Sequence, residues 1–274
     1  MMDRHAQIDL FVADILDITP KGDLTTMEHP VFALSTKPDK EVWEYRNPSS
    51  EIYIKVSPSQ AGRPTIFDKD LLMYCISHVV EGMNRGRQIS RRVHITAYDF
   101  LKATGRGTGG KDYEALLAAA ERLRGVTITI QGASQGKTRR RADVRGLIES
   151  ATVIESDNKG RMVHLEIVLS EWIYEAIEDK RILTYHPSYY TLRKPNERRL
   201  YELCRKFCGT QAKWQIGEEK LYRYFGTRAT VREFRRKLKQ LVDEQNIPDY
   251  QVTYDREAAM VTVRYLSTGL VDNP

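Results

Sequence analysis

Residues 95–124 read ITAYDFLKATGRGTGGKDYEALLAAAERLR, and this stretch decides the fold. Its first part, residues 95–103, has the start signals and apolar spacing of a short helix. The glycine-rich run 105–110 breaks that pattern. Helical spacing resumes over 112–124, with apolar residues on one face. Helix, sharp turn and helix in this order predict a helix-turn-helix.

The segments on either side predict a winged helix. Before the stretch, apolar residues from Asp68 onward recur at helical spacing until Gly82. After it, residues 126–130 alternate at strand period, and 146–155 and 162–169 have the composition of further strands. A helix-turn-helix followed by a β-hairpin is a winged helix. We expect the polar, basic loop 132–143 to be its wing.

The same outline recurs toward the C-terminus, over 198–266. Ile95 matches Ile216, Phe100 and Leu101 match Leu221 and Tyr222, and Gly105 matches Gly226, all at an offset of 121 residues. After a shorter turn, the core positions of the third helix also match, namely Leu116, Ala120 and Leu123 with Phe234, Leu238 and Leu241. The preserved offset predicts an internal duplication, and hence an α+β protein with two tandem winged-helix domains.

Three regions follow from this pattern. Residues 1–62 form an acidic N-terminal extension with a short β-hairpin, whose strands we place at 42–46 and 52–56 around an Asn-Pro-Ser-Ser loop. Residues 63–180 form the first winged-helix domain, and residues 181–274 form the second.

Charge is distributed unevenly along the chain. The 274 residues carry a net charge of +6, but residues 1–60 hold six Lys/Arg against ten Asp/Glu, so that the remainder carries +10. A basic body favours a polyanionic partner, because Lys and Arg release counterions from nucleic acid when they neutralise phosphates. The alternative is a basic protein with a merely solvated surface.

Composition also indicates the cellular compartment of the protein. The three cysteines are odd in number and lie in helical patterns, which favours a reducing compartment. No apolar run approaches the roughly 18 residues of a membrane span, and the N-terminus lacks the layout of a signal peptide. We therefore expect a cytoplasmic protein without membrane contact.

The strongest candidate for DNA recognition is the predicted helix 231–242. Six Lys/Arg accompany one acid, Glu233, between positions 228 and 239. Arginines in the third helix of a winged helix face the major groove, where they can bond guanine or phosphate. A solvated basic face is the alternative. The candidate contacts here are Arg228 and Thr230 in the turn, and Arg232, Arg235, Arg236 and Lys239 on the helix.

In the first domain we expect contacts with the DNA backbone instead of with bases. Its basic loop predicts a wing that grips phosphates, and the turn before its third helix could present side chains and helix amides to the DNA backbone. The outward side of that helix, with Asp112, Glu114, Ala115, Ala118 and Arg122, is mixed in sign and poor for base recognition. The candidates are Lys137, Arg139, Arg140 and Arg141 in the loop, and Arg106, Thr108 and Lys111 in the turn.

Three patterns imitate catalytic or metal sites. Residues 105–111 have the spacing of a phosphate-binding P-loop, but Asp112 stands where a magnesium-binding Ser or Thr is required. Cys204 and Cys208 lack a second pair to complete a zinc site. Tyr189-Tyr190 could be a DNA-nicking nucleophile, but no His-x-His pair accompanies it, and a packing role explains it. We expect no catalytic residue, metal or cofactor.

The chain resembles the replication initiator protein A family of plasmids. The resemblance lies in residues 27–35 (MEHPVFALS), more specifically in residues 65–77 (TIFDKDLLMYCIS), and in Leu200-Tyr201-Glu202. It covers most of residues 27–266. The Asp-Lys-Asp segment at 68–70 lies within a pattern of apolar residues, and we interpret it as structural and not catalytic.

The resemblance implies tandem winged-helix domains that bind repeated sequences of double-stranded origin DNA. It also implies opening of the nearby duplex, recruitment of the host replication initiator and replicative helicase, and repression of the protein's own promoter. Initiators of this type exchange a repressing homodimer for an initiating monomer. Two alternatives stay open: a transcriptional repressor of the same fold, and a nicking enzyme of rolling-circle replication.

Overall fold

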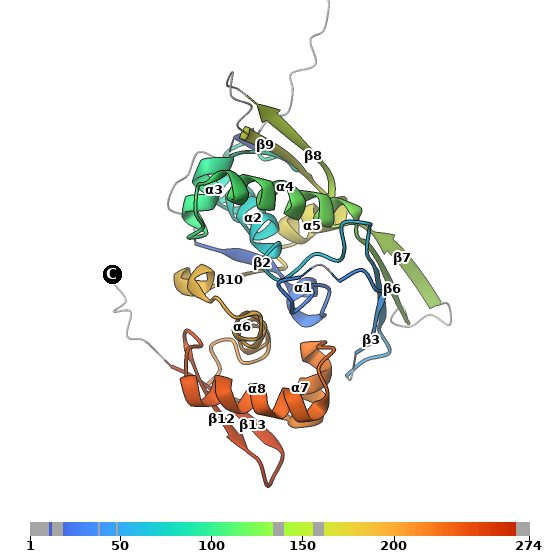
Figure 1. Cartoon of the computed structure of the whole chain (residues 1–274), viewed down its shortest axis with the longest axis vertical. Coiled ribbons are helices and arrows are strands. Elements are labelled where there is room, and N and C mark those ends of the chain that lie inside the picture. Colours follow the sequence, from blue (N-terminus) through green and yellow to red (C-terminus); the bar gives the residue numbers. More distant parts are fainter. Residues whose placement is uncertain are drawn as a thin grey trace, which may run out of the picture.

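Two segments with the same order of helices and strands form the two ends of the molecule (Figure 1). The structure is a computed structural model and describes residues 11–12, 19–37, 39–47, 49–133, 140–155 and 162–266. Helices and strands mix throughout the chain, so the predicted α+β class is confirmed.

The first unit lies at the upper end in Figure 1. Its central helix buries the predicted apolar positions, including Leu71, Leu72 and Cys75. Its sheet has the order β1-β5-β9-β8. The elements are β1 (Phe11–Val12), α2 (Lys69–Asn84), β5 (Arg92–Thr96), α3 (Ala97–Ala103), α4 (Gly110–Gly125), β8 (Ile148–Glu155) and β9 (Met162–Leu169).

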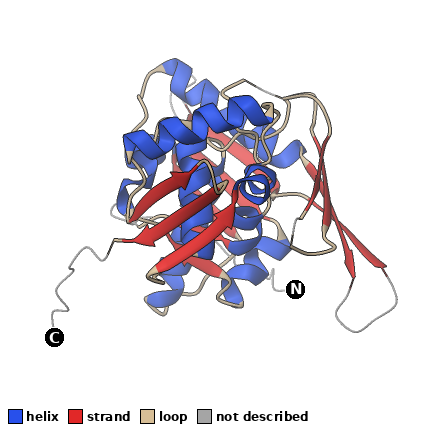
Figure 2. Ribbon diagram, turned by 90° about the horizontal axis from the view of Figure 1, so that it is seen from below, coloured by secondary structure: helices blue, strands red, loops and turns tan. Residues whose placement is uncertain are grey.

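The second unit lies at the lower end, with its three strands at the front of the view in Figure 2. Its sheet has the order β11-β13-β12. The elements are α6 (Pro195–Phe207), β11 (Lys213–Gly217), α7 (Glu218–Phe225), α8 (Val231–Glu244), β12 (Tyr250–Asp255) and β13 (Met260–Tyr265).

Residues matched at the offset of 121 occupy equivalent positions in the two units. Ile95 pairs with β9, an inner strand of its sheet, and Ile216 pairs with β13, the middle strand of its sheet, and both side chains are buried. Gly105 and Gly226 end the second helix of each unit with φ of 62° and 63°, the left-handed region that favours glycine. The two units therefore share one scaffold.

A third sheet does not belong to this scaffold. It has the order β3-β4-β6-β7, and it contains the N-terminal hairpin predicted at 42–56. The basic loop therefore joins β6, which pairs with β4, to β7, which pairs with β6, whereas the hairpin of the first unit's own sheet is β8-β9. The prediction that loop 132–143 is the wing of that sheet is wrong, because β6-β7 is an inserted hairpin. The strands are β3 (Trp43–Arg46), β4 (Tyr53–Ser57), β6 (Thr127–Ala133) and β7 (Arg140–Arg145).

The described part of residues 19–63, here called the N-terminal segment, contacts both units, and its elements β2 and α1 lie between them (Figure 1). Strand β2 pairs with β10, α1 contacts α6, and the Tyr224 hydroxyl bonds Ser49 at 2.9 Å. The division of the chain at residues 62 and 180 stays a prediction. The remaining elements are α1 (Leu24–Glu28), β2 (Lys21–Asp23), α5 (Glu171–Glu178), β10 (Ile182–Thr184) and the short 3₁₀ helix η1 (Pro187–Thr191).

A network of buried charges joins α2 to α6. Lys69 Nζ lies 2.6 Å from Glu202 Oε1, and Arg198 Nη1 lies 2.5 Å from Asp70 Oδ1, with all four side chains at most 2% exposed. Burial opposes the charged form of Arg198, but Asp70, with Tyr189 and Glu202, outweighs it, so the pKa of Arg198 is raised. The Asp-Lys-Asp segment at 68–70 is therefore structural, as interpreted from its sequence.

Gly226 is the most constrained glycine of the repeated pair. A Cβ there would lie 2.1 Å from the Pro30 Cβ, whereas a Cβ at Gly86, which also has a positive φ of 67°, would meet nothing within 4 Å. We expect Gly86→Ala to cost roughly 1–2 kcal/mol of unfolding free energy through the left-handed backbone alone. Gly226→Ala should cost about 1–3 kcal/mol more through the clash. Urea unfolding of both variants tests this, and equal losses would contradict it.

The buried network generates a second prediction. Lys69→Met leaves the Glu202 carboxylate without its main partner, and we expect a loss of about 3–5 kcal/mol in unfolding free energy. Adding Glu202→Gln to Lys69→Met should recover part of that loss, because the buried carboxylate charge that has lost its lysine is then removed. Chemical denaturation of the four proteins of this double-mutant cycle measures the coupling. Additive losses would mean that the two charges do not depend on each other.

Candidate nucleic-acid interface

Helix α8 separates an apolar face from a basic face. Phe234, Leu238 and Leu241 are buried against the second unit. The helix begins in a capping box, in which the Glu233 amide donates to the Thr230 hydroxyl at 3.3 Å and the Thr230 amide donates to the Glu233 carboxylate at 2.9 Å. The packed face and the cap fix the rotation of the helix, so its basic side chains face solvent.

The basic face lines a hollow of about 440 Å³ between α8 and the β12-β13 hairpin, here called the α8 groove. Figure 1 shows this hairpin running beneath α8 at the lower end of the molecule. The structure brings together the four cations that the sequence predicted for this helix. It adds Arg256, which the sequence did not indicate as part of a basic surface because it stands between Asp255 and Glu257. The lining residues are Arg232, Arg235, Arg236, Lys239, Tyr254 and Arg256.

Arg235 is the cation of the groove with a fixed position. Its Nε donates to Glu218 Oε1 at 2.7 Å, and the Tyr254 hydroxyl donates to the other oxygen of that carboxylate. Glu218 is 5% exposed while Arg235 is 53% exposed. Partial burial, together with the bond to Glu218, raises the pKa of Tyr254. A buried carboxylate thus orients one guanidinium and ties α8 to both α7 and the hairpin.

The other groove cations are less restrained. Among the residues that the structure describes, neither Arg232 nor Arg236 has a hydrogen-bond or ion-pair partner, and both are exposed. Lys239 pairs with Asp243 one turn away, but both side chains are more than half exposed, and such a pair is weak. These side chains are free to meet a ligand.

Arg228, in the turn before α8, is held by the N-terminal segment. Its guanidinium lies 3.0 Å from Asp39 and 3.1 Å from Glu41, and it stacks over the Trp43 ring at 5.1 Å. The predicted DNA contacts of Arg228 and Thr230 stay predictions, and the structure gives each an internal partner.

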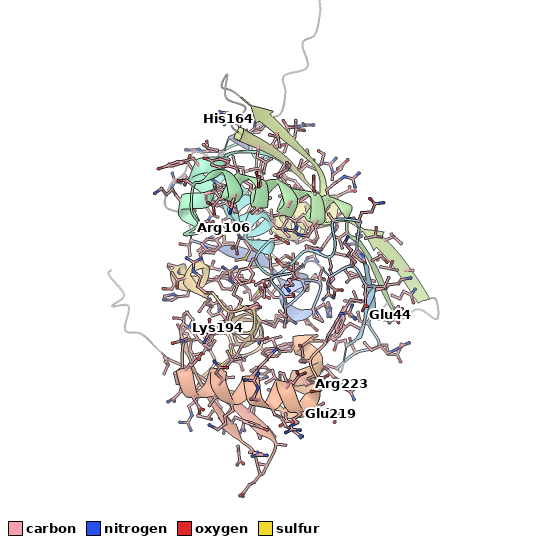
Figure 3. The ribbon with its side chains drawn as sticks, viewed as in Figure 1. Glu44, Arg106, His164, Lys194, Glu219 and Arg223 are labelled. Atoms are coloured by element: carbon pink, nitrogen blue, oxygen red, sulfur yellow. The ribbon has the colours of Figure 1, made fainter. Side chains whose placement is uncertain are left out.

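The turn before α4 differs from its counterpart. Figure 3 labels Arg106 in the upper unit, where its guanidinium donates to the Phe67 carbonyl at 2.6 Å and to Asp70 at 2.9 Å. The side chain is 19% exposed. Thr108 and Lys111 are exposed. Of the three side chains in this turn that we expected to contact the DNA backbone, Arg106 therefore points inward, and the other two lie at the surface.

The outer face of α4 lacks the basic character of α8. Aligning the buried positions places Glu114 where α8 has Arg232, Leu117 where it has Arg235, and Glu121 where it has Lys239. Arg122, which we expected to face outward, instead forms two bonds of 2.8 Å with Asp68, so that expectation is wrong.

Two of the four cations predicted to contact DNA from the basic loop, Lys137 and Arg139, lie outside the described residues. Arg140 and Arg141 lie at the start of β7, and the β6-β7 hairpin projects from the body of the molecule in both views (Figures 1 and 2). DNA contact by this hairpin stays a prediction.

The patterns that imitate catalytic sites have structural roles. Residues 104–109 join α3 to α4, and Asp112 accepts a hydrogen bond from the Gly109 amide. Tyr189 is fully buried and donates its hydroxyl to Glu202 at 3.0 Å, and burial raises its pKa well above the usual value. Cys204 and Cys208 are buried thiols. Within the described residues no cluster of three or more His, Cys, Asp or Glu could hold a metal ion.

Comparison with known proteins places the chain in a family. The family model for replication initiator protein A matches residues 21–252, from β2 to β12. The chain belongs to this family. A curated relative, a "putative replication protein" of Wigglesworthia glossinidia brevipalpis, is 35% identical over 259 residues, which cover 93% of this chain and 92% of that protein.

Solved structures match the fold of this replication initiator protein A family member. Two crystal structures of domains 2 and 3 of RctB cover 88% and 86% of the chain, and 98% and 94% of their own length. Their TM-scores are 0.62 and 0.54, at sequence identities of 10% and 11%. The likeness covers both units together. Within the described part of the chain, the structure has no helix of the length and hydrophobicity needed for a membrane span.

The orientation of Arg235 generates a prediction with a matched control. Glu218→Gln removes the charge that holds Arg235 and Tyr254, so we expect a lower thermal unfolding midpoint and a lower pKa for Tyr254. Glu219→Gln removes one acid at the neighbouring position, where Glu219 pairs with Arg223 on the surface of α7 (Figure 3) and is 79% exposed. It should leave both quantities unchanged. Calorimetry and tyrosine NMR titration measure them, and equal effects would contradict the role of Glu218.

Proposed function

We propose that the protein is a plasmid replication initiator that binds repeated origin sequences in double-stranded DNA. The α8 groove is the observation that carries this proposal, because five cationic side chains converge there on an ordered helix and hairpin. Membership of the replication initiator protein A family supports the biological role. The protein acts by binding, without a cofactor or an enzymatic step, and it works in the cytoplasm.

Each unit is a winged helix in this proposal. In both, a helix is followed by a strand, two helices and a hairpin that pairs with that strand. In the second unit α8 is the recognition helix and β12-β13 is the wing, which carries Arg256. In the first unit α4 takes the equivalent place and β8-β9 is the wing.

The two units have different tasks. The second recognises sequence through Arg232, Arg235, Arg236 and Lys239 in a major groove. The first positions the DNA backbone through Thr108, Lys111 and the β6-β7 hairpin. Two units on one rigid scaffold would then span successive major grooves of one repeat.

Binding to the repeats is the first step of initiation. The bound protein then promotes opening of the adjacent duplex and recruits the host replication initiator and the replicative helicase. Binding near its own promoter represses transcription, and exchange between a homodimer and a monomer separates repression from initiation.

Mobility-shift titrations test the recognition helix. We expect Arg236→Ala to lose on the order of 10- to 100-fold in affinity for the origin repeat and to relax its specificity, because an arginine that contacts a base contributes to both. Arg140→Ala should weaken repeat and shuffled duplexes alike, as a phosphate contact does. Arg181→Ala is the control, since Arg181 is an exposed arginine that pairs with Asp179 and does not line the α8 groove. If Arg236→Ala and Arg140→Ala both match this control, the assignment of recognition helix and hairpin is wrong.

Plasmid maintenance separates an initiator from a repressor. A footprint on the plasmid's own origin identifies the repeats, and the gene with those repeats should sustain a plasmid that has no other origin. Repression without maintenance would establish a repressor. A covalent protein-DNA adduct lost on replacing Tyr189 and Tyr190 with Phe would establish a nicking enzyme.

A further inference from the structure

We propose that a second pocket, beside the α8 groove, binds a phosphate group. It lies between the N-terminal segment and the turn before α8, has a volume of about 430 Å³, and is here called the Arg63 pocket. This inference rests on the proposed function where it assigns the phosphate to the DNA backbone. The charged lining residues are Lys37, Asp39, Arg63, Arg228, Glu233 and Lys237.

Arg63 is the residue that points to an anion. Its side chain is 2% exposed, and its Nε and Nη1 atoms have no hydrogen-bond partner. The Nη2 atom lies 3.3 Å from Asp39, and the guanidinium stacks over the Trp43 ring at 4.9 Å. Burial is the main cause that lowers the pKa of Arg63 to about 10, and Asp39 offsets it only in part. A buried guanidinium with unsatisfied donors is costly unless further negative charge approaches it.

The pocket as a whole also carries surplus positive charge. Its four cations face two carboxylates, those of Asp39 and Glu233, so the balance of these lining residues is +2. Glu41 reaches Arg228 from outside the pocket and is 78% exposed. Lys37 and Lys237 form no ion pair with any residue in the described ranges. The surplus suits one phosphate group.

The Asp39 carboxylate occupies the position between Arg63 and Arg228 where a bound anion would lie. It bridges Arg63 at 3.3 Å and Arg228 at 3.0 Å, while the Asp39 backbone carbonyl accepts from the Arg63 amide at 2.7 Å. Because the backbone is anchored independently, the side chain can turn aside and let a phosphate oxygen reach both guanidiniums. Glu233 does not compete in the same way, because the α8 cap engages its carboxylate.

The position on α8 matches the path of a DNA backbone. Helical residues are separated by about 100° around the axis, so Glu233 and Lys237 lie roughly a quarter turn from Arg232 and Arg236. When the basic face points at the floor of a major groove, the flank of the helix faces one of the two phosphate strands. The Arg63 pocket lies on that flank, beside the N-terminal end of α8, whose dipole also favours an anion.

The test compares three variants of the full chain. The double variant Lys37→Ala/Lys237→Ala removes two surface cations without breaking an ion pair among the described residues, so it should fold normally. Asp39→Asn removes the competing carboxylate charge. The control Lys180→Asn/Lys213→Ala removes two exposed lysines that line neither the α8 groove nor the Arg63 pocket. Asparagine suits position 180, where φ is 55°.

Fluorescence anisotropy with repeat and shuffled duplexes over a salt series is the first measurement. We expect the Lys37/Lys237 variant to lose on the order of 10-fold in affinity for both duplexes, and the slope of log affinity against log salt to fall by about 1–2. Asp39→Asn should bind both duplexes several-fold more tightly. These results would assign the pocket to a backbone phosphate.

Thermal unfolding with inorganic pyrophosphate, against chloride at matched ionic strength, is the second measurement. Stabilisation of the wild type that the Lys37/Lys237 variant lacks would assign the pocket to a free phosphate compound, and it would stand even if the wild type bound no duplex and the proposed function failed. If the wild type binds duplex through Arg236 while the pocket variants equal the control in both measurements, the pocket is not a phosphate site and the proposed function is unaffected.

Discussion

The docking of α2 on α6 through buried charges is the constraint on which the molecule depends. Lys69, Asp70, Arg198 and Glu202 are withdrawn from water, and each charge is tolerated only with its partner in place. A shift between α2 and α6 would leave these buried charges without their partners, which is strongly destabilising. The network therefore specifies one arrangement of the two units, and with it the distance between their third helices.

The N-terminal segment extends this constraint to the second unit. Arg199 donates to the Met27 and Glu28 carbonyls on α1 and to the Tyr224 carbonyl at the end of α7. The Pro30 ring packs against Gly226, in the turn that leads into α8. The orientation of α8 thus depends on residues nearly 200 positions earlier in the sequence. A chain that lacked this segment would lose the Arg63 pocket and the support of the turn.

The sequence predicts best what local periodicity encodes. The amphipathic pattern of 231–242 locates α8 and its basic face, and the offset of 121 residues locates both left-handed glycines. Long-range pairing leaves no such local pattern, which is why the β6-β7 hairpin was placed in the wrong sheet. The same reason explains Arg106 and Arg122. A charged side chain on a helix or turn appears solvated until its partner, Asp70 or Asp68, arrives from another element. The Arg63 pocket was missed because its cations come from three separate segments.

The two units show how one scaffold can carry two surfaces. Their buried positions are equivalent, so the same core packing stabilises both units. The outer faces of α4 and α8 take no part in that packing, and their residues can differ. On α8 those positions carry cations, whereas on α4 they carry Glu114, Leu117 and Glu121, with Leu117 39% exposed. A phosphate-rich groove would attract the first face, whereas these positions of the second face offer it no cation. A chain that gains affinity from one unit can therefore use the equivalent face of the other for contacts other than base recognition, while the buried network keeps both at a fixed separation.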